Sequence, residues 1–166
     1  SDRKHAEHAA RRLAAVVESS DDAIVSKDLN GNITSWNRGA ERIFGYAAAE
    51  IIGRHISVLK PPEHSEDVIQ ILERIRHGER VNHFETKRCT KDGRIIDVSL
   101  SVSPIRDAGG TIVGASKVAR DITERKLVEQ KLKQLALYDT LTGLPNRTLI
   151  FDRIVQLLQL AKRNEK

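Results

Sequence analysis

Residues 28–37 read Asp-Leu-Asn-Gly-Asn-Ile-Thr-Ser-Trp-Asn and carry the strongest local signal for the architecture of this chain. The dipeptide Asn30-Gly31 is a two-residue turn signal, because both residue types accept the positive backbone dihedrals of a tight hairpin. Residues 23–28 favour a strand before the turn, and residues 32–37 favour the strand that returns. We therefore expect a β-hairpin near the start of the sheet.

The segments around this hairpin predict helices. Residues 2–18 have a narrow apolar stripe, and residues 38–53 form brief helical pieces separated by glycines. Residues 63–77 place Val68, Ile71, Leu72 and Ile75 at i, i+3, i+4 and i+7, which predicts an amphipathic helix that ends at Gly78. Glu63 and Glu66 are interpreted as residues at the start of this helix.

Three further strands are predicted at residues 81–90, 96–103 and 111–121, joined by glycine-containing turns. In the middle strand, apolar and polar residues alternate, so one face of the sheet is expected to be buried and the other wet. The apolar residues are Ile96, Val98, Leu100 and Val102, and the polar ones are Asp97, Ser99, Ser101 and Ser103. A charged helix is expected from Thr123 onward.

Composition narrows the classes of function. A chain of 166 residues with 39% hydrophobic residues supports one core of ordinary size. The net charge of +5 comes from basic residues interleaved with acidic ones, so we interpret them as a solvated surface and expect no nucleic-acid partner. Cys89 is the single cysteine, and no apolar run reaches the length of a membrane span, so we expect a cytoplasmic protein without membrane contact in this chain.

Several segments together resemble a PAS domain, over about residues 16–125. They are Asp28 to Asn37, Ala40-Glu-Arg-Ile-Phe-Gly-Tyr, Ile51-Ile-Gly-Arg, Lys91-Asp-Gly-Arg and Asp121-Ile-Thr-Glu-Arg. The resemblance implies an α+β fold, in which a five-stranded antiparallel sheet carries short helices on one face and is flanked by N-terminal and C-terminal helices. The expected organisation is an N-terminal helix at 1–18, a PAS domain at 19–122, a signalling helix at 123–138 and a final segment at 139–166.

The signalling helix carries Val128, Leu132 and Leu135 at steps of four and three, which is the spacing of a coiled-coil seam. We predict that this seam pairs in parallel with a second copy, giving a homodimer. The alternative is a monomeric helix packed on its own sheet. After Gly143 and Pro145, Asn146 is expected to cap a last helix with an apolar face.

The run Asp139-Thr-Leu-Thr-Gly-Leu-Pro-Asn-Arg147 resembles the segment that leads into a GGDEF domain in diguanylate cyclases and GGDEF-EAL hybrids. Catalytic residues of such domains would lie beyond Lys166, so we expect no enzyme activity and no catalytic residue in this chain. The resemblance implies a sensory and dimerisation module for cyclic di-GMP signalling, in which Asp121, Ile122 and Thr123 couple the sheet to the output. The alternatives are a haem- or flavin-binding redox or gas sensor, a histidine-kinase sensor and a stand-alone small-molecule binding domain.

The residues that would hold a cofactor are not in place, so no prosthetic group is expected. Flavin domains of the light-sensing type carry a cysteine shortly after a Gly-Arg pair, but His55 follows Gly53-Arg54 here. Weak candidates for holding flavin, haem or another small molecule are Trp36, Asn37, His64 and His83, while Trp36 is as readily interpreted as a core residue. No metal-ligand spacing is present in the sequence. A small-molecule ligand inside the fold remains an open alternative.

Overall fold

The computed structural model describes residues 2–62, 66–137 and 141–164 of the chain. The chain divides into two compact units, Ser1–Thr123 and Glu124–Lys166. Each unit is described separately. Glu63, His64 and Ser65 at the start of the predicted helix, and Tyr138, Asp139 and Thr140, lie outside the described residues.

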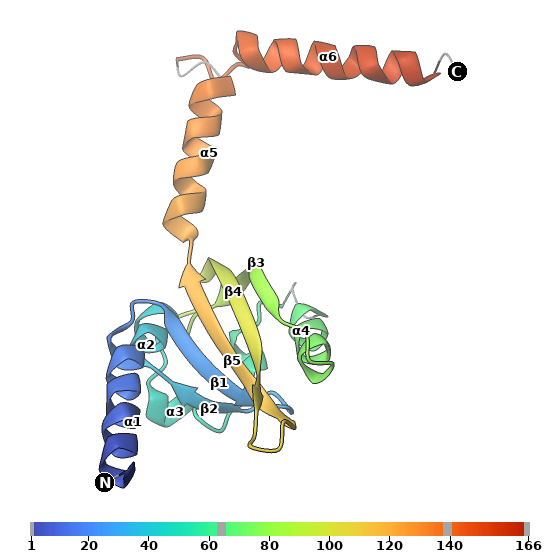
Figure 1. Ribbon diagram of the computed structural model, residues 1–166. Helices are drawn as coiled ribbons and strands as arrows, with labels where there is room; N and C mark the ends of the chain where they lie inside the picture. Colours follow the sequence, from blue (N-terminus) through green and yellow to red (C-terminus); the bar gives the residue numbers. More distant parts are fainter. Residues whose placement is uncertain (1, 63–65, 138–140, 165–166) are drawn as a thin grey trace. The chain divides into compact units, whose positions relative to one another are not determined.

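The first unit is built on a five-stranded sheet in the order β2-β1-β5-β4-β3, in which every neighbouring pair is antiparallel (Figure 1). The strands are β1 (Ala23–Asp28), β2 (Ile33–Trp36), β3 (Val81–Cys89), β4 (Ile95–Arg106) and β5 (Ile112–Asp121). The predicted α+β architecture with a five-stranded antiparallel sheet is therefore confirmed.

Helices of this unit precede the sheet or lie between its second and third strands. They are α1 (Asp2–Ser19), α2 (Arg38–Phe44), α3 (Ala48–Ile51), the 3₁₀ helix η1 (Ile56–Leu59) and α4 (Glu66–Arg76). The apolar stripe predicted for α4 is buried at Val68, Ile71, Leu72 and Ile75. A left-handed Gly78 with φ of 82° follows the helix, as expected for a residue that ends it.

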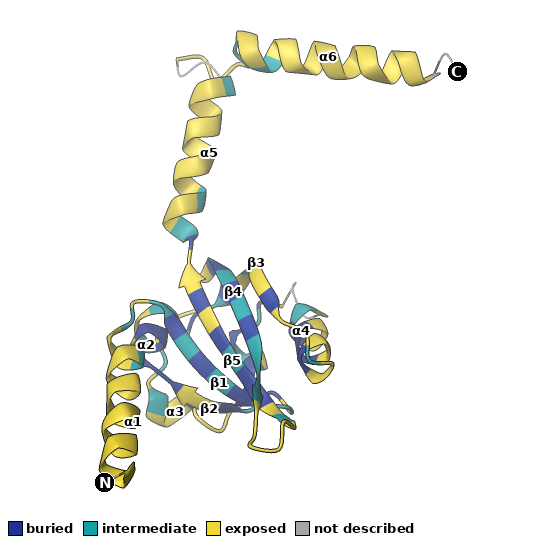
Figure 2. Cartoon of the chain, viewed as in Figure 1, coloured by how far each residue is buried: buried dark blue, intermediate teal, exposed yellow. Residues whose placement is uncertain are grey.

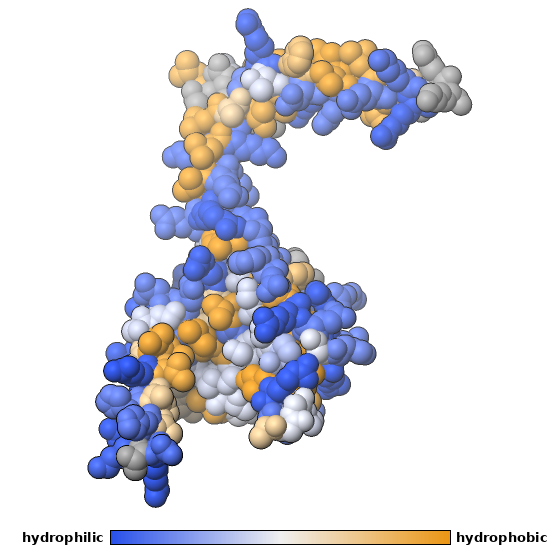
Figure 3. All heavy atoms as spheres, in the orientation of Figure 1, coloured by the Kyte–Doolittle hydropathy of each residue, from blue (hydrophilic) through white to orange (hydrophobic). Residues whose placement is uncertain are grey.

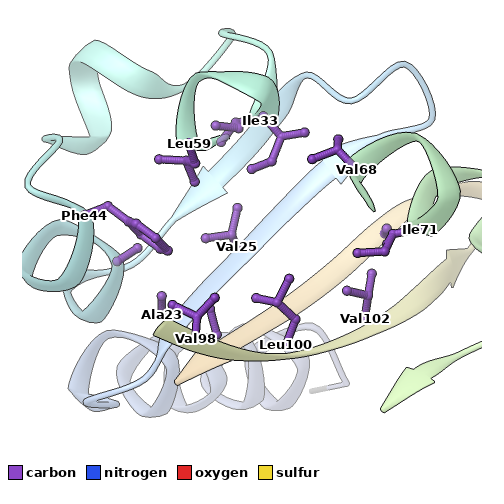
Figure 4. Close-up of a cluster of buried hydrophobic side chains, with 14 of the residues drawn as sticks. Ala23, Val25, Ile33, Phe44, Leu59, Val68, Ile71, Val98, Leu100 and Val102 are labelled. Carbon is purple, nitrogen blue, oxygen red and sulfur yellow. The ribbon is translucent and has the colours of Figure 1, made fainter. Parts of the chain in front are cut away.

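The core lies between one face of the sheet and the helices α2, α3, η1 and α4, whereas α1 has no buried residue (Figure 4). Val25 from β1 and Val98, Leu100 and Val102 from β4 point toward Phe44, Leu59, Val68 and Ile71 (Figure 4). Figure 2 shows the alternation of buried and more exposed residues along the strands. The strand periodicity read from residues 96–103 is thus confirmed, because its apolar members are all buried.

The first hairpin is wider than the sequence predicts. Strand β1 ends at Asp28 and β2 begins at Ile33, so four residues connect them, whereas the predicted strand ends leave three and the Asn-Gly signal predicts a tight two-residue turn. Asp28 Oδ1 accepts hydrogen bonds from the backbone amides of Asn30 and Asn32, each at 2.9 Å, while Gly31 adopts a φ of 90°. The side chain of Asp28 therefore organises a longer turn, an interaction that the Asn-Gly rule does not include.

The second unit contains most of α5 (Thr123–Leu137) and all of α6 (Arg147–Asn164). Asn146 caps α6 as predicted, because its Oδ1 accepts from the amide of Leu149 at 3.2 Å. Its side-chain amide donates to the carbonyl of Ala136, and its backbone amide donates to that of Leu137 at 2.5 Å, near the end of α5. Apolar atoms are exposed along both helices (Figure 3). Within the described ranges, no helix combines the length and apolarity that crossing a bilayer requires.

Candidate functional site

Three basic side chains lie inside the first unit, on the same face of the sheet as the apolar core. Lys27 on β1 is 4% exposed, Lys117 on β5 is 2% exposed and Arg88 on β3 is 2% exposed. Strand alternation places two of them there, because Lys27 continues the buried series Ala23 and Val25, and Lys117 lies between the buried Ala115 and Ala119. We call Lys27, Arg88, Lys117 and the carboxylate of Asp67 the buried charge cluster.

The two lysines are diagonal neighbours across the β1–β5 pairing. Lys27 lies opposite Ala115, and Lys117 lies opposite Val25. On the other side of β5, Lys117 lies opposite the buried Val102 of β4. The small alanines beside Lys117 leave room for its aliphatic stem, and its Nζ lies 5.8 Å from the ring centroid of Phe44. The amine of Lys117 is therefore set among apolar side chains.

Asp67, in the first turn of α4, supplies the carboxylate of the cluster. Its Oδ2 accepts hydrogen bonds from Arg88 Nη1 at 2.8 Å and from Thr86 Oγ1 at 2.6 Å. Its Oδ1 is buried without a hydrogen-bond partner among the described residues. Burial raises the pKa of Asp67, but the hydrogen bonds from Arg88 and Thr86 outweigh it, so the pKa lies below its usual value. The carboxylate is therefore charged at neutral pH.

Each lysine loses basicity in this environment. Burial lowers the pKa of Lys27 to about 8, with a further contribution from the positive charge of Arg88 and a partial compensation from Asp67. Burial lowers the pKa of Lys117 well below its usual value, and repulsion by Lys27 and Arg88 adds to the effect. Among the described residues, neither amine has a hydrogen-bond acceptor or an ion-pair partner. Three basic groups thus share one carboxylate.

This cluster was not predicted from the sequence. The interpretation of the basic residues as solvated surface is wrong for Lys27, Arg88 and Lys117, which are buried. A usable signal existed at Lys117, which follows the core-facing Ala115 and precedes the core-facing Ala119 at the period of a strand. Asp67 gave no comparable signal, since acidic residues are common in the first turn of any helix.

The candidate residues Trp36 and Asn37 occupy structural positions. Trp36 is buried, its Nε1 donates to the carbonyl of Tyr46 at 2.9 Å, and its ring lies 5.6 Å from that of Phe44. Asn37 Oδ1 accepts from the amides of Ile24 and Ala40, both at 2.9 Å. Its Nδ2 donates to the carbonyls of Val17 and Asp22, at 2.7 and 3.1 Å. Asn37 therefore links α1, β1 and α2, and its polar atoms are fully used.

The other candidates are dispersed. His83 is exposed in an irregular part of β3, with a φ of 50°, and His64 lies outside the described residues. Cys89 is partly buried at the end of β3. In the part of the chain that the structure describes, no three residues of the types His, Cys, Asp and Glu are grouped so that they could hold a metal ion.

The predicted coupling residues form a connected junction where β5 ends and α5 begins. Asp121 Oδ1 accepts hydrogen bonds from both the amide of Thr123, at 3.0 Å, and its hydroxyl, at 2.6 Å. The hydroxyl oxygen of Thr123 accepts from the amide of Asp97 on β4 at 3.2 Å. Ile122 is buried, and its amide donates to the carbonyl of Asp97 at 2.9 Å. The first residue of α5 is thus tied to two strands.

The predicted seam residues Val128, Leu132 and Leu135 of α5 are 51%, 60% and 50% exposed. In α6, the side chains of Ile150, Ile154 and Leu158 are likewise 49%, 50% and 61% exposed. Exposed apolar side chains at this spacing fit a surface that another chain covers. The parallel pairing of two α5 helices stays a prediction.

A family model described as "PAS fold" matches residues 11–122, more than half of the chain. The crystal structure of a PAS domain from Colwellia psychrerythraea superposes with a TM-score of 0.64 at 30% identity, covering 69% of this chain and 97% of that one.

Two curated relatives place similar sequences within larger signalling proteins. The cyclic di-GMP phosphodiesterase PdeB of Shewanella oneidensis is 28% identical over 148 residues, which are 88% of this chain and 17% of PdeB. The signal transduction histidine-protein kinase AtoS of Escherichia coli K12 is 28% identical over 126 residues, 76% of this chain and 20% of AtoS. The chain spans less than a third of the length of the curated relatives it matches.

Proposed function

The chain belongs to the PAS family, the sensory domains of signal-transduction proteins, and from that premise we propose that it controls a C-terminal cyclic di-GMP output domain. The output is a GGDEF domain, alone or followed by an EAL domain, and this chain acts as its sensory and dimerisation module. The parent protein is then a diguanylate cyclase or a cyclase and phosphodiesterase hybrid. The chain itself contributes control and no catalytic group.

The observation that carries this proposal is the junction at Asp121 and Thr123. Hydrogen bonds from these residues tie the start of α5 to β4 and β5, so a change in the sheet is transmitted to the helix that leaves the domain. The segment Leu141–Arg147, with its resemblance to the start of a GGDEF domain, follows the end of α5 after three residues in sequence. The alignment with PdeB, which covers 88% of this chain at 28% identity, supports the same class of output.

The mechanism follows from paired helices. Two GGDEF domains must meet face to face to join two GTP molecules, so their alignment depends on the register and angle of the helices that precede them. A PAS domain that favours one arrangement of the α5 pair shifts the fraction of time in which the two sites oppose each other. The seam of Val128, Leu132 and Leu135 provides the contact for this pairing.

The test uses the full-length protein and two insertions after Leu135. Seven inserted helix-forming residues preserve the heptad register, whereas three rotate the output domains relative to the sensor. Synthesis and hydrolysis of cyclic di-GMP are measured by chromatography of nucleotides from the purified protein. We expect the seven-residue insertion to retain regulated turnover and the three-residue insertion to change it severalfold. A full-length protein without cyclic di-GMP turnover, or identical rates for both insertions, would contradict the proposal.

A further inference from the structure

We propose that the buried charge cluster is a binding site for a small organic carboxylate, whose head group is held by Lys27 and Lys117. This inference names the ligand class of the sensory role proposed above and rests on that role only for its biological meaning. Binding itself concerns residues 1–123 and is measured without any output domain.

The buried charge cluster holds three basic side chains and one carboxylate. Lys27 and Lys117 are nearly inaccessible to solvent, and Arg88 already donates to the only carboxylate of the cluster, that of Asp67. Buried amines are normally paired, because an uncompensated charge in an apolar interior is costly. An interior with two amines that lack an acceptor among the described residues is therefore matched to an anion.

Lys27 and Lys117 come from adjacent strands, β1 and β5. Their strands are hydrogen-bonded neighbours, and the diagonal register between them brings the two amines to one region of the inner face. Asp67 and Arg88 come from α4 and β3, so the cluster bridges the helical layer and both halves of the sheet. An anion held there contacts elements that lead directly to the junction, since β5 carries both Lys117 and Asp121.

The surroundings distinguish an organic carboxylate from a more strongly hydrated anion. Lys117 has Phe44 beneath its amine and Val25, Val102, Ala115 and Ala119 as buried neighbours on the strands. Hydrocarbon next to a carboxylate matches these walls, whereas inorganic phosphate would leave oxygens facing apolar groups. The cluster also keeps Asp67 charged, which opposes a multiply charged ligand.

The experiment measures binding to residues 1–166 with acetate, propionate and butyrate as probes, by calorimetry and by thermal unfolding at matched ionic strength. Butyramide and inorganic phosphate serve as comparison compounds. We expect at least one carboxylate to bind saturably with a stoichiometry of one and to raise Tm by about 5 °C at concentrations about 100-fold above its Kd. Butyramide and phosphate should give no saturable effect.

Lys117→Met and Lys27→Met test the assignment to these amines. Each replaces an amine by an apolar side chain of similar length, so the free protein should melt no lower than wild type while carboxylate binding weakens at least tenfold. Lys91→Met is the control, because Lys91 is an exposed lysine paired with Glu50, and it should bind like wild type. If one variant does not fold, calorimetry with the other decides.

Three results would overturn the site: no saturable binding of any of the three carboxylates, equal binding by wild type and both cluster variants, or phosphate and butyramide binding as strongly. Failure of the proposed function looks different. If carboxylate binding depends on Lys117 but cyclic di-GMP turnover by the full-length protein does not respond to the same carboxylate, the binding site stands. Its role in controlling the output is then contradicted.

Discussion

Asp67 on α4 and Arg88 on β3 form an ion pair with 2.8 Å between Oδ2 and Nη1, and the guanidinium side of this pair is almost completely buried. The pair joins the longest helix between the strands to the edge strand of the sheet. Its carboxylate also offsets the charges of Lys27 and Lys117, so one acidic residue serves three basic ones.

Asp67→Asn should therefore destabilise the fold by about 3 kcal/mol, because it leaves three buried basic groups without a carboxylate. The amide still accepts a hydrogen bond, so the loss reports mainly on charge. Urea unfolding at pH 7 measures the free energy of unfolding. Glu50→Gln is the control, since the partner of the exposed Lys91 lies at the surface and should change stability little. Equal effects of the two substitutions would show that the cluster is not electrostatically coupled.

Lys27 predicts an unusual dependence of stability on alkaline pH. Its pKa is about 8 in the folded chain and 10.5 in the reference state of an exposed lysine. Between these values the unfolded chain holds a proton that the folded chain has released, so the free energy of unfolding rises with pH in this window. Below pH 8 both states are protonated, and the cost of the buried charge is constant.

Over the whole range from pH 8 to 10.5, Lys27 raises the free energy of unfolding by roughly 3 kcal/mol. Lys27→Met lacks this titration, so its stability advantage over wild type at pH 7 should shrink as pH rises from 8 to 10. Lys117, Arg88 and Asp67 face the same region and stay in both proteins. Chemical denaturation at half-unit pH steps measures the difference. A constant gap from pH 7 to 10 would mean that Lys27 has an ordinary pKa when folded.

The contrast between Val98 and Lys117 shows how far the sequence predicts this fold. Val98 belongs to a strand whose alternation of apolar and polar residues gives both its type and its buried face, and the structure agrees. Lys117 follows the same two-residue period, but charged side chains are assigned to solvent by default. Only the packing of Ala115, Ala119 and Phe44 around its stem shows that the lysine points inward.

The candidate sites divide for a similar reason. The resemblance to PAS domains predicted a junction at Asp121 and Thr123, and because these residues are two positions apart their hydrogen bonds are local. The pair of Asp67 and Arg88 joins residues 21 positions apart, and no local pattern specifies that contact. The sequence makes Asn37 a candidate for cofactor binding. In the structure its side chain makes four hydrogen bonds to backbone groups of four other residues, and these contacts depend on tertiary structure.

Asn37→Ala should destabilise the first unit by about 3 kcal/mol, because it leaves the amides of Ile24 and Ala40 without their acceptor. Asn37→Asp separates its two roles. The carboxylate keeps an acceptor for those amides but loses the donors to Val17 and Asp22, so hydrogen exchange should quicken mainly at the end of α1. Thermal unfolding and exchange mass spectrometry give both readouts. Equal exchange along α1 in Asn37→Asp and wild type would contradict the tether.

Asp121→Ala should loosen the start of α5 and change the output of the full-length protein. The substitution removes the acceptor for the amide and hydroxyl of Thr123, a loss of about 1 kcal/mol for a helix start. Asp107→Ala is a matched control, because Asp107 Oδ1 accepts amides of Gly109 and Thr111 in a remote turn. We expect faster exchange in the first turn of α5 and altered cyclic di-GMP production for Asp121→Ala alone. Unchanged production would count against a coupling role.

Leu132→Glu tests the seam of α5, where Val128, Leu132 and Leu135 are exposed in the single chain. A carboxylate at the centre of a two-heptad seam would be buried against its own copy in a parallel pair, and this like-charge contact disfavours pairing. Sedimentation equilibrium of residues 1–166 should show a dimer for wild type and at least a tenfold weaker association for the variant. Gln134→Glu adds the same charge outside the seam and should leave the dimer intact. If wild type is monomeric at high concentration, or both variants associate equally, the exposed leucine has another role and the signalling mechanism based on a helix pair is wrong.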